Sequence, residues 1–188
     1  MDERLARYAT ELFAVEDAIL TTIRARQELL RLPPIHISAD EGKLLHVLLR
    51  AVRATRVLEV GSLAGYSGVW LARALPPEGR LTTIERDARH AALARQAFAE
   101  AGLSGRVHVL EGAALDVLPT LAPGFDAVFL DADKASLPQY FERSLTLLRE
   151  GGLLLCDNAF FHGSVVDPAD HSPDTAGVRA FNLLAATD

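Results

Sequence analysis

The order of apolar and polar positions divides the chain into two parts. From residue 2 to residue 32 apolar side chains recur mostly at helical spacing, until Pro33 and Pro34 interrupt the pattern. Ser38 and Glu41 then form a Ser-x-x-Glu capping box, in which each side chain can bond the other residue's backbone N–H. A second helix is predicted from there to about residue 53.

A different rhythm follows, in which short apolar runs alternate with helical stretches. The runs are apolar at successive positions, which is typical of parallel strands covered by helices on both faces. We therefore predict a Rossmann-like α/β fold with a doubly wound, mostly parallel sheet. The predicted strands span residues 57–60, 81–84, 107–110, 127–130 and 153–156.

Turn-forming residues mark where the intervening helices end. The "PPEG" segment at 76–79 is predicted to end the first, and Gly102 is predicted to follow the second. The "EGG" segment at 150–152 is predicted to close a helix that begins near Pro138, and a last helix is predicted at 176–186.

No repeat, low-complexity segment or linker divides the chain. We interpret residues 1–188 as one domain, with a helical N-terminal extension at 1–53 and a cofactor-binding α/β core at 54–188. A hydrophobic content of 49% excludes a disordered chain. The net charge of −6 argues against a nucleic-acid partner, which normally requires a clustered basic surface.

The compartment is predicted from the cysteine content and from hydropathy. Cys156 is the only cysteine, which excludes an internal disulfide and a Cys-based metal site and suits a reducing compartment. No apolar run approaches the ~20 residues needed to cross a bilayer, and the charged N-terminus is unlike a signal peptide. We expect a cytoplasmic protein with a small-molecule ligand and no membrane partner.

Every predicted strand finishes at or beside an acidic residue. In an open parallel sheet, ligands bind outside the carboxyl ends of the strands, so these acids are expected to converge on one crevice. Such a rim indicates a polar, cationic or metal-bearing ligand. The acids are Glu59, Glu85, Glu111, Asp131 and Asp157.

The segment "EVGSLAGYSG" at 59–68 has the pattern of a strand, a Gly-rich turn and a helix start. Gly61 and Gly65 are spaced Gly-x-x-x-Gly, a poor match to the Gly-x-Gly-x-x-Gly of dinucleotide sites. Glu59 would repel a pyrophosphate but attract an ammonium group. Glu85 lies where such sheets place an acid for the ribose hydroxyls. An amino acid joined to a ribose indicates S-adenosylmethionine.

A metal site is predicted where two neighbouring strands end. The strand before Asp131 is expected beside the strand before Asp157, ~4.8 Å away. Carboxylates that close repel unless a proton or a cation lies between them. Asn158 adds a neutral oxygen. This all-oxygen set suits Mg²⁺, or Ca²⁺ or Mn²⁺.

Four segments together carry a family resemblance: "VLEVGSLAGYSGVWLARALP", "LTTIERD", "FDAVFLDADK" and "GGLLLCDNAFFHGSV". From Ile37 onward the chain resembles the cation-dependent O-methyltransferases, the family of catechol and caffeoyl-coenzyme A O-methyltransferases and their small bacterial relatives. The paired "DADK" and "DN" motifs are more specific than the Gly-rich turn. The resemblance implies the same metal ligands, Asp131, Asp157 and Asn158.

The resemblance also implies which residues contact the cofactor. Those expected at its methionine part are Glu59, Gly61 and Ser67, and Glu85 is expected at the ribose. Ala114 is expected against the adenine, with Asp131 and Asp133 also facing the cofactor and Ser62 and Ile37 contacting it largely through backbone.

The expected chemistry is transfer of an already activated methyl group to an oxygen that the protein must deprotonate and hold in line. A divalent cation would lower a phenol pKa below its usual ~10, and Lys134 would accept the proton as general base. We therefore count Lys134 and Asp131 as the catalytic residues. The expected substrate is a hydroxylated small molecule, a catechol or another vicinal-diol aromatic, with a larger bacterial metabolite as an open alternative.

Two other functions are open at this point. A nicotinamide-dependent oxidoreductase would use the same sheet, but it predicts the Gly-x-Gly-x-x-Gly that is missing here. A non-catalytic S-adenosylmethionine-binding module would bind the cofactor without turnover. The family normally continues into two more strands, so we expect that the C-terminal strands are missing from this sequence. An uncovered sheet edge favours association, which supports a homodimer.

Overall fold

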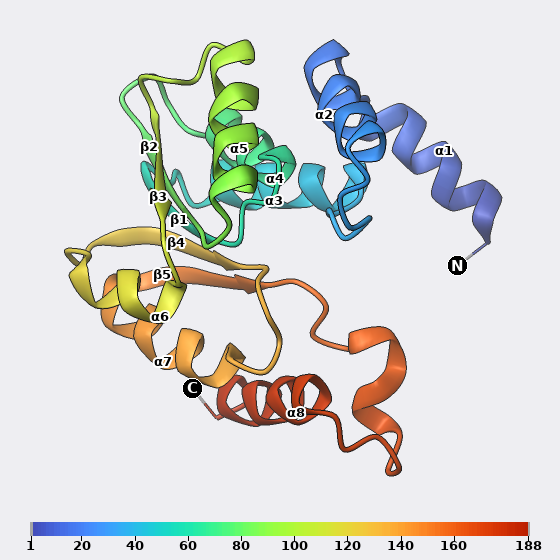
Figure 1. The fold of residues 1–188 in the computed structure, drawn as a ribbon, viewed down its shortest axis with the longest axis vertical. Helices are drawn as coiled ribbons and strands as arrows, with labels where there is room; N and C mark the ends of the chain where they lie inside the picture. The colour runs from blue at the N-terminus through green and yellow to red at the C-terminus, as the bar shows by residue number, and fades with distance from the viewer. Residues whose placement is uncertain (1, 188) are drawn as a thin grey trace.

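The computed structural model describes residues 2–187. An N-terminal group of helices is followed by strands that alternate with helices (Figure 1). The first helices are α1 (Glu3–Phe13), α2 (Ala18–Leu29) and α3 (Ala39–Ala51). The alternating part comprises β1 (Arg56–Val60), α4 (Tyr66–Ala74), β2 (Arg80–Glu85), α5 (Ala88–Glu100), β3 (Val107–Glu111), α6 (Ala114–Val117), η1 (Leu118–Thr120), β4 (Phe125–Leu130), α7 (Leu137–Leu147), β5 (Leu148–Cys156), η2 (Phe161–Val166) and α8 (Pro173–Ala185).

The strands form a five-stranded sheet in the order β3-β2-β1-β4-β5, and every pair is parallel. The predicted doubly wound α/β fold is therefore confirmed. Strand order reverses after β3, so β1 and β4 are neighbours at the centre although they are far apart in the sequence. Val60, Leu130 and Cys156 lie side by side in register, and all three are the last residues of their strands.

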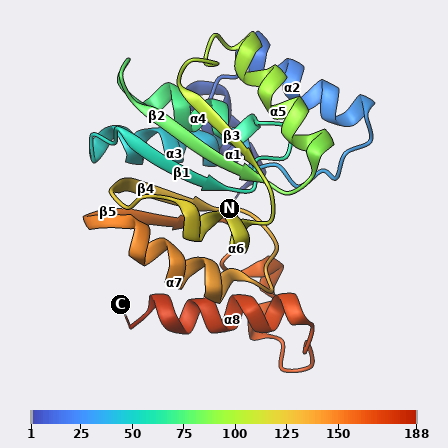
Figure 2. The same cartoon turned by 60° about the vertical axis from the view of Figure 1, so that its left-hand side comes forward.

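Helices cover both faces of the sheet (Figure 2). One face packs against α3, α4 and α5, the other against α6 and α7, and α8 forms an outer layer on α7. Each face has its own apolar core. Val57 and Ala127 belong to one core, whereas the next residues along their strands, Leu58 and Val128, belong to the other. Burial on both faces explains why the strands are apolar at successive positions.

Most of the predicted boundaries are confirmed. The capping box forms as predicted: Glu41 N donates to Ser38 Oγ, and Ser38 N donates to Glu41 Oε2. Gly102 follows α5 with a left-handed φ of 71°, which suits glycine. The N-terminal extension contains a break that the periodicity did not reveal, because Asp17 caps a new helix there.

The predicted role of residues 150–152 is wrong. They do not close a helix, because α7 already ends at Leu147 and these residues lie within β5. Between consecutive pairings β4 advances from Phe125 to Ala127, whereas β5 advances from Leu148 to Leu153. The extra residues of β5 form an irregular bulge, and Gly151 supplies the positive φ of 69° that such a bulge needs.

A helix that crosses a bilayer must be about 20 residues long and mostly apolar. Among residues 2–187, no helix is both long and apolar enough to span a bilayer.

Candidate active site

The carboxyl ends of three neighbouring strands, β1, β4 and β5, meet at one edge of the sheet. Asp131 N donates to Val60 O at 2.9 Å, and Asp157 N donates to Leu130 O at 3.0 Å. Gly61, Asp131 and Asp157 therefore follow three adjacent strands directly. The predicted proximity of the two aspartates is confirmed by this register.

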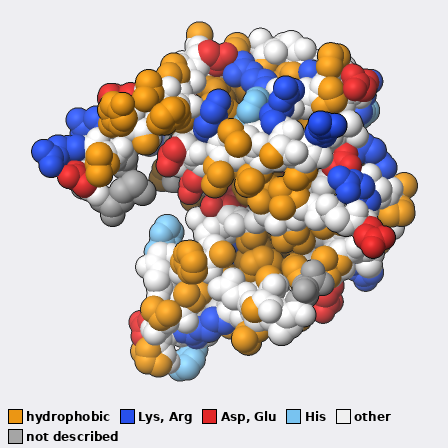
Figure 3. Space-filling view, turned by 180° about the vertical axis from the view of Figure 1, so that it is seen from behind, with side chains coloured by type: hydrophobic (Ala, Val, Ile, Leu, Met, Phe, Trp, Pro, Cys, Tyr) orange, Lys and Arg blue, Asp and Glu red, His pale blue; other side chains and the backbone are white. Residues whose placement is uncertain are grey.

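A cleft of about 540 Å³ opens at this edge. Its walls come from the Gly-rich turn after β1, the ends of β2 and β3, and the loop after β4. Residues from the N-terminal extension, Gln27 and His36 among them, line it as well. Figure 3 shows a notch between two arms of the molecule, with acidic side chains near its inner end and histidine on the lower arm.

The turn after β1 passes very close to the loop after β4. Gly61 has a φ of +97°, and a Cβ added there would lie 2.1 Å from Asp131 O. Glycine is therefore required at this position for both its conformation and its size. The close approach places the cofactor-type turn directly against the first residue of the "DADK" loop.

The donors of this turn already have an acceptor in the protein. Ser62 N and Leu63 N donate to Glu85 Oε2 at 3.3 and 2.9 Å, and Asp87 N donates to Glu85 Oε1 at 2.9 Å. A carboxylate thus occupies the position that a phosphate would take in a dinucleotide site. The turn is consequently a poor pyrophosphate site, in agreement with its glycine spacing.

Glu59 lies behind the turn and not on the cleft surface. Its side chain is fully buried and accepts hydrogen bonds from Ser67 Oγ at 2.5 Å and Thr83 Oγ1 at 2.6 Å. Burial raises its pKa to about 7, although both hydroxyls oppose the shift. Glu59 could act on a ligand in the cleft only indirectly, through its hydrogen bond with Ser67, which lines the cleft.

The loop after β4 brings a buried lysine against the aspartates. Lys134 is 8% exposed, and its Nζ donates to Asp131 Oδ1 at 3.2 Å and to Asp157 O at 3.4 Å. Burial raises the pKa of Asp131 to about 6; Lys134 opposes this shift and the Asp157 carboxylate adds to it. Burial also raises the pKa of Asp157. Two half-buried carboxylates therefore lie beside one ammonium group, which pairs with the carboxylate of Asp131.

This charge imbalance fits a further cation. Asn158, directly after Asp157, lines the cleft and offers an amide oxygen. Across residues 2–187, no three His, Cys, Asp or Glu side chains gather as a metal site, so a cation here would rely on two carboxylates, an amide oxygen and outside ligands. Oxygen donors of this kind suit Mg²⁺, Ca²⁺ or Mn²⁺.

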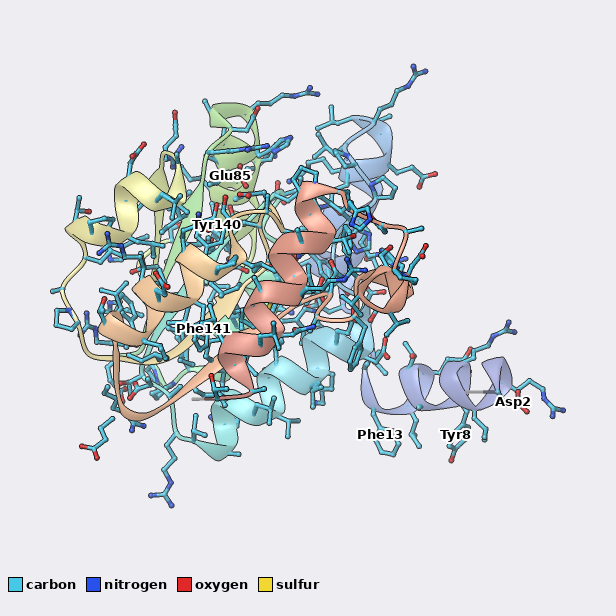
Figure 4. All side chains as sticks on the ribbon, turned by 90° about the horizontal axis from the view of Figure 1, so that it is seen from below. Asp2, Tyr8, Phe13, Glu85, Tyr140 and Phe141 are labelled. Atoms are coloured by element: carbon cyan, nitrogen blue, oxygen red, sulfur yellow. The ribbon has the colours of Figure 1, made fainter. Side chains whose placement is uncertain are left out.

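Asp133 turns to the other side of the loop. Its Oδ1 accepts from Ser136 N at 3.1 Å and its Oδ2 from Tyr140 Oη at 2.5 Å. Burial opposes ionisation of Asp133, but these hydrogen bonds outweigh it and lower the pKa. Tyr140 also lines the cleft, and Figure 4 labels it together with Glu85. Sequence analysis missed Tyr140, whose only signal is its position one turn into the helix that follows the loop.

The structure brings most of the predicted site residues to one cleft. Those that line it are Gly61, Ser62, Ser67, Glu85, Ala114, Asp131, Asp133, Lys134 and Asn158. Ile37, Glu59 and Asp157 lie just behind this surface, and their predicted ligand contacts stay predictions. The expected rim of five acids is wrong for Glu59, which is fully buried behind the turn, and for Glu111, whose side chain lies 3.4 Å from Arg95 on α5 and leaves Gly112 at the cleft.

Comparison with known proteins agrees with this geometry. The model of the O-methyltransferase family matches residues 10–188. The chain is 40% identical to a catechol O-methyltransferase of Niastella koreensis over 187 residues, which covers 97% of this chain and 84% of the relative. It is also 40% identical to a catechol O-methyltransferase of Mycobacterium tuberculosis, over 90% of this chain and 77% of the relative.

Solved structures show the same fold. The O-methyltransferase TomG of Streptomyces achromogenes, involved in tomaymycin synthesis and solved with SAM, aligns with a TM-score of 0.93 and 42% identity over 100% of this chain and 88% of that one. A Bacillus cereus O-methyltransferase in complex with SAH aligns with a TM-score of 0.93 and 36% identity, over 98% and 86% of the two chains. The protein therefore belongs to the O-methyltransferase family of S-adenosylmethionine-dependent enzymes.

Proposed function

We propose that this enzyme methylates a hydroxyl of a catechol-like or other vicinal-diol small molecule, and that it requires a divalent cation. The observation that carries the proposal is the group formed by Lys134, Asp131 and Asp157, which lies against the Gly61 turn. The cofactor, bound at the Gly61 turn, and the acceptor, bound at Asp131, would thus lie on either side of the contact between these two backbone segments. The two relatives named as catechol O-methyltransferases support the substrate class.

The cofactor side of the cleft is suited to a nucleoside with an amino-acid tail. Glu85 accepts three backbone N–H bonds, yet its two oxygens offer about four lone-pair sites, so one remains for a ribose hydroxyl. Ala114 and Tyr140 provide an apolar surface for a flat base. Ser67, held by Glu59, is available to the amino-acid end.

On the acceptor side, Asp131, Asp157 and Asn158 would hold the cation. When bound, a divalent cation favours ionisation of an acceptor hydroxyl. Lys134 Nζ, once it has released its own proton and is a neutral amine, would take the proton of that hydroxyl, and its burial keeps bulk water from competing. The acceptor oxygen then forms a bond to the methyl carbon while the bond from that carbon to sulfur breaks, which releases S-adenosylhomocysteine.

A larger bacterial metabolite is the second candidate substrate. The relative involved in tomaymycin synthesis is 42% identical to this chain, slightly more than the two catechol O-methyltransferases. Phe161 and His162 extend the lining of the cleft on the acceptor side, which suits an acceptor larger than a single ring.

Methyl transfer from labelled S-adenosylmethionine to a panel of catechols and bulkier vicinal diols tests the proposal. We expect transfer to one oxygen of a vicinal diol, with loss of activity on chelation and recovery with Mg²⁺. Turnover that is unchanged by chelation would remove the cation from the proposal. Tight binding of S-adenosylhomocysteine with no turnover on any acceptor would identify a non-catalytic binding module instead.

The proposal includes a homodimer formed through α1. Leu5, Tyr8, Leu12 and Phe13 of this helix are between 53% and 63% exposed. Figure 4 shows α1 projecting from the body, with Tyr8 and Phe13 on the same side of the helix. An apolar face of this kind favours cover by a second copy. Light scattering after gel filtration should give a dimer that Leu12→Asp dissociates, and a monomeric wild type would contradict this part of the proposal.

A further inference from the structure

Helix α8 contacts the backbone of the "DADK" loop more closely than any side chain would allow. A Cβ added to Gly177 would lie 2.2 Å from Lys134 O and 2.8 Å from the Ala135 Cα. One turn earlier, Asp174 Oδ1 accepts a hydrogen bond from Ala135 N at 3.1 Å. The backbone that carries Lys134 is therefore fixed by α8 through both packing and a charged hydrogen bond.

Helix α8 also contacts a second loop, residues 161–170, which follows β5. Arg179 donates to four backbone carbonyls of this loop through its Nε and both terminal nitrogens. The acceptors are Ser164 O at 3.0 Å, Val165 O at 3.0 Å, Asp170 O at 2.8 Å and Asp167 O. A planar guanidinium can satisfy several carbonyls at fixed angles, whereas an ammonium cannot.

The loop that Arg179 holds begins with an unfavourable backbone. Phe161 and His162 have φ values of 41° and 53°, in the left-handed region that residues with a Cβ rarely adopt, and Gly163 follows at 91°. Such conformations persist only where the surrounding structure enforces them. Phe161 and His162 both line the cleft, so the enforced turn places their side chains at the acceptor.

We propose that α8 fixes the distance between Lys134 and the acceptor wall formed by Phe161 and His162, with Asp174 and Arg179 as positioning residues. This inference rests on the proposed function, because it takes Lys134 as the proton acceptor. Figure 1 shows α8 beside the segment that leads from β5 through η2. Substrate selection would then depend on a helix whose contacts with both loops go mainly to the backbone of those loops.

A purely structural role for α8 is the competing explanation. Val178 and Phe181 are buried where α8 packs on α7, so they contribute to the stability of the helix. The two explanations differ in their predictions. A structural role predicts that variants of α8 change the melting temperature and the KM values of both S-adenosylmethionine and the acceptor. A positioning role predicts that only the acceptor KM changes.

Arg179 is tested by Arg179→Ala and Arg179→Lys, with Arg143→Ala on the exposed face of α7 as the matched control. We expect amide exchange of residues 161–170 to accelerate and the acceptor KM to rise roughly tenfold in both variants, with the KM of S-adenosylmethionine unchanged. If Arg179→Ala does not fold, Arg179→Lys supplies the test. Unchanged exchange together with an unchanged acceptor KM, or an equal rise in both KM values, would overturn the proposal.

Asp174 is tested by the pair Asp174→Asn and Asp174→Ala. The amide oxygen of Asn still accepts from Ala135 N, so we expect Asp174→Asn to keep kcat within about twofold and Asp174→Ala to lower it roughly tenfold. If Asp174 acted only through its charge at the N-terminus of α8, both variants would lower kcat equally. An equal loss of kcat in the two variants would therefore contradict the positioning role.

The exchange measurement separates this inference from the proposed function. Should the wild type methylate no vicinal diol, the proposed function fails, but faster exchange of residues 161–170 in the Arg179 variants would still support the part of the inference that concerns the loop. If the wild type is active and neither exchange nor the acceptor KM changes in these variants, the inference fails alone.

Discussion

Strand β4 has an aspartate near each end, and the two have opposite surroundings. Asp126 Oδ2 accepts from Thr55 N, Thr55 Oγ1 and Arg56 N at 2.7 to 2.9 Å, and its Oδ1 accepts from Arg149 Nε at 2.6 Å. Burial alone would raise its pKa, but these donors lower it to about 2. Asp131, just after the other end, accepts from Lys134, and burial raises its pKa to about 6.

The comparison teaches that surroundings, and not residue type, decide what each carboxylate contributes. Asp126 is ionised with every donor in place, so it stabilises the edge of the sheet where the strands begin. Asp131 lies beside a second half-buried carboxylate, Asp157, so its charge costs stability until a further cation or a proton arrives. One edge of the sheet is built for stability and the other for chemistry.

The largest effect is expected at the chemical edge. Lys134→Ala should lower kcat by about 10² to 10⁴, the usual contribution of a general base. The control is Lys43→Ala, which replaces the chain's other lysine, on α3. Steady-state kinetics with S-adenosylmethionine and a catechol provide the measurement. A Lys134→Ala enzyme as fast as the wild type would remove the assignment of this residue as base.

At the opposite edge the expected effect is on stability alone. Asp126→Ala should lower the free energy of unfolding by about 4 kcal/mol, because it leaves Thr55 N, Arg56 N and Arg149 without their acceptor. Urea unfolding measures this loss against Asp116→Asn, an exposed aspartate on α6. Because the pKa of Asp126 is lowered, its stabilisation should be present above about pH 4 and disappear as the pH falls toward 2. Equal stabilities of the two variants would show that Asp126 is not a structural anchor.

The comparison can be extended to Glu59, a fully buried acid near the site. Its pKa is raised from 4.5 to about 7, so the folded protein keeps a proton that the unfolded chain loses across this interval. Stability should therefore fall by about 3 kcal/mol as the pH rises from 4.5 to 7, and then level off. Glu59→Gln should flatten most of this slope, whereas Glu78→Gln in an exposed turn should leave it intact. If the pH dependence of stability is unchanged in Glu59→Gln, it arises from other titratable groups.

Sequence patterns predicted the fold well where local chemistry determines it. Strands buried on both faces, such as Ala127–Leu130, are apolar at every position, and the Ser38 capping box and the glycine after α5 are local signals. The ends of parallel strands meet at one edge by geometry, so the proximity of Asp131 and Asp157 could also be predicted.

Features that depend on the packing of distant segments could not be predicted. The bulge at Gly151 depends on how β5 pairs with β4, and the side-chain direction of Glu111 depends on Arg95 of α5. No pattern reveals that Arg179 reaches four carbonyls, or that Gly177 touches Lys134. These contacts form only when α8 docks, and the sequence around them reads as an ordinary amphipathic helix.

The most direct test of the central claim is the stability of wild type and Asp131→Asn in urea, each with and without Mg²⁺. Without the cation, we predict that Asp131→Asn is at least as stable as the wild type, since it removes one of two adjoining half-buried negative charges. At about a hundredfold excess over its dissociation constant, Mg²⁺ should stabilise the wild type by about 2.7 kcal/mol and leave the variant unchanged. Equal stabilisation of both proteins, or of neither, would contradict the claim that these carboxylates are kept together to hold a cation.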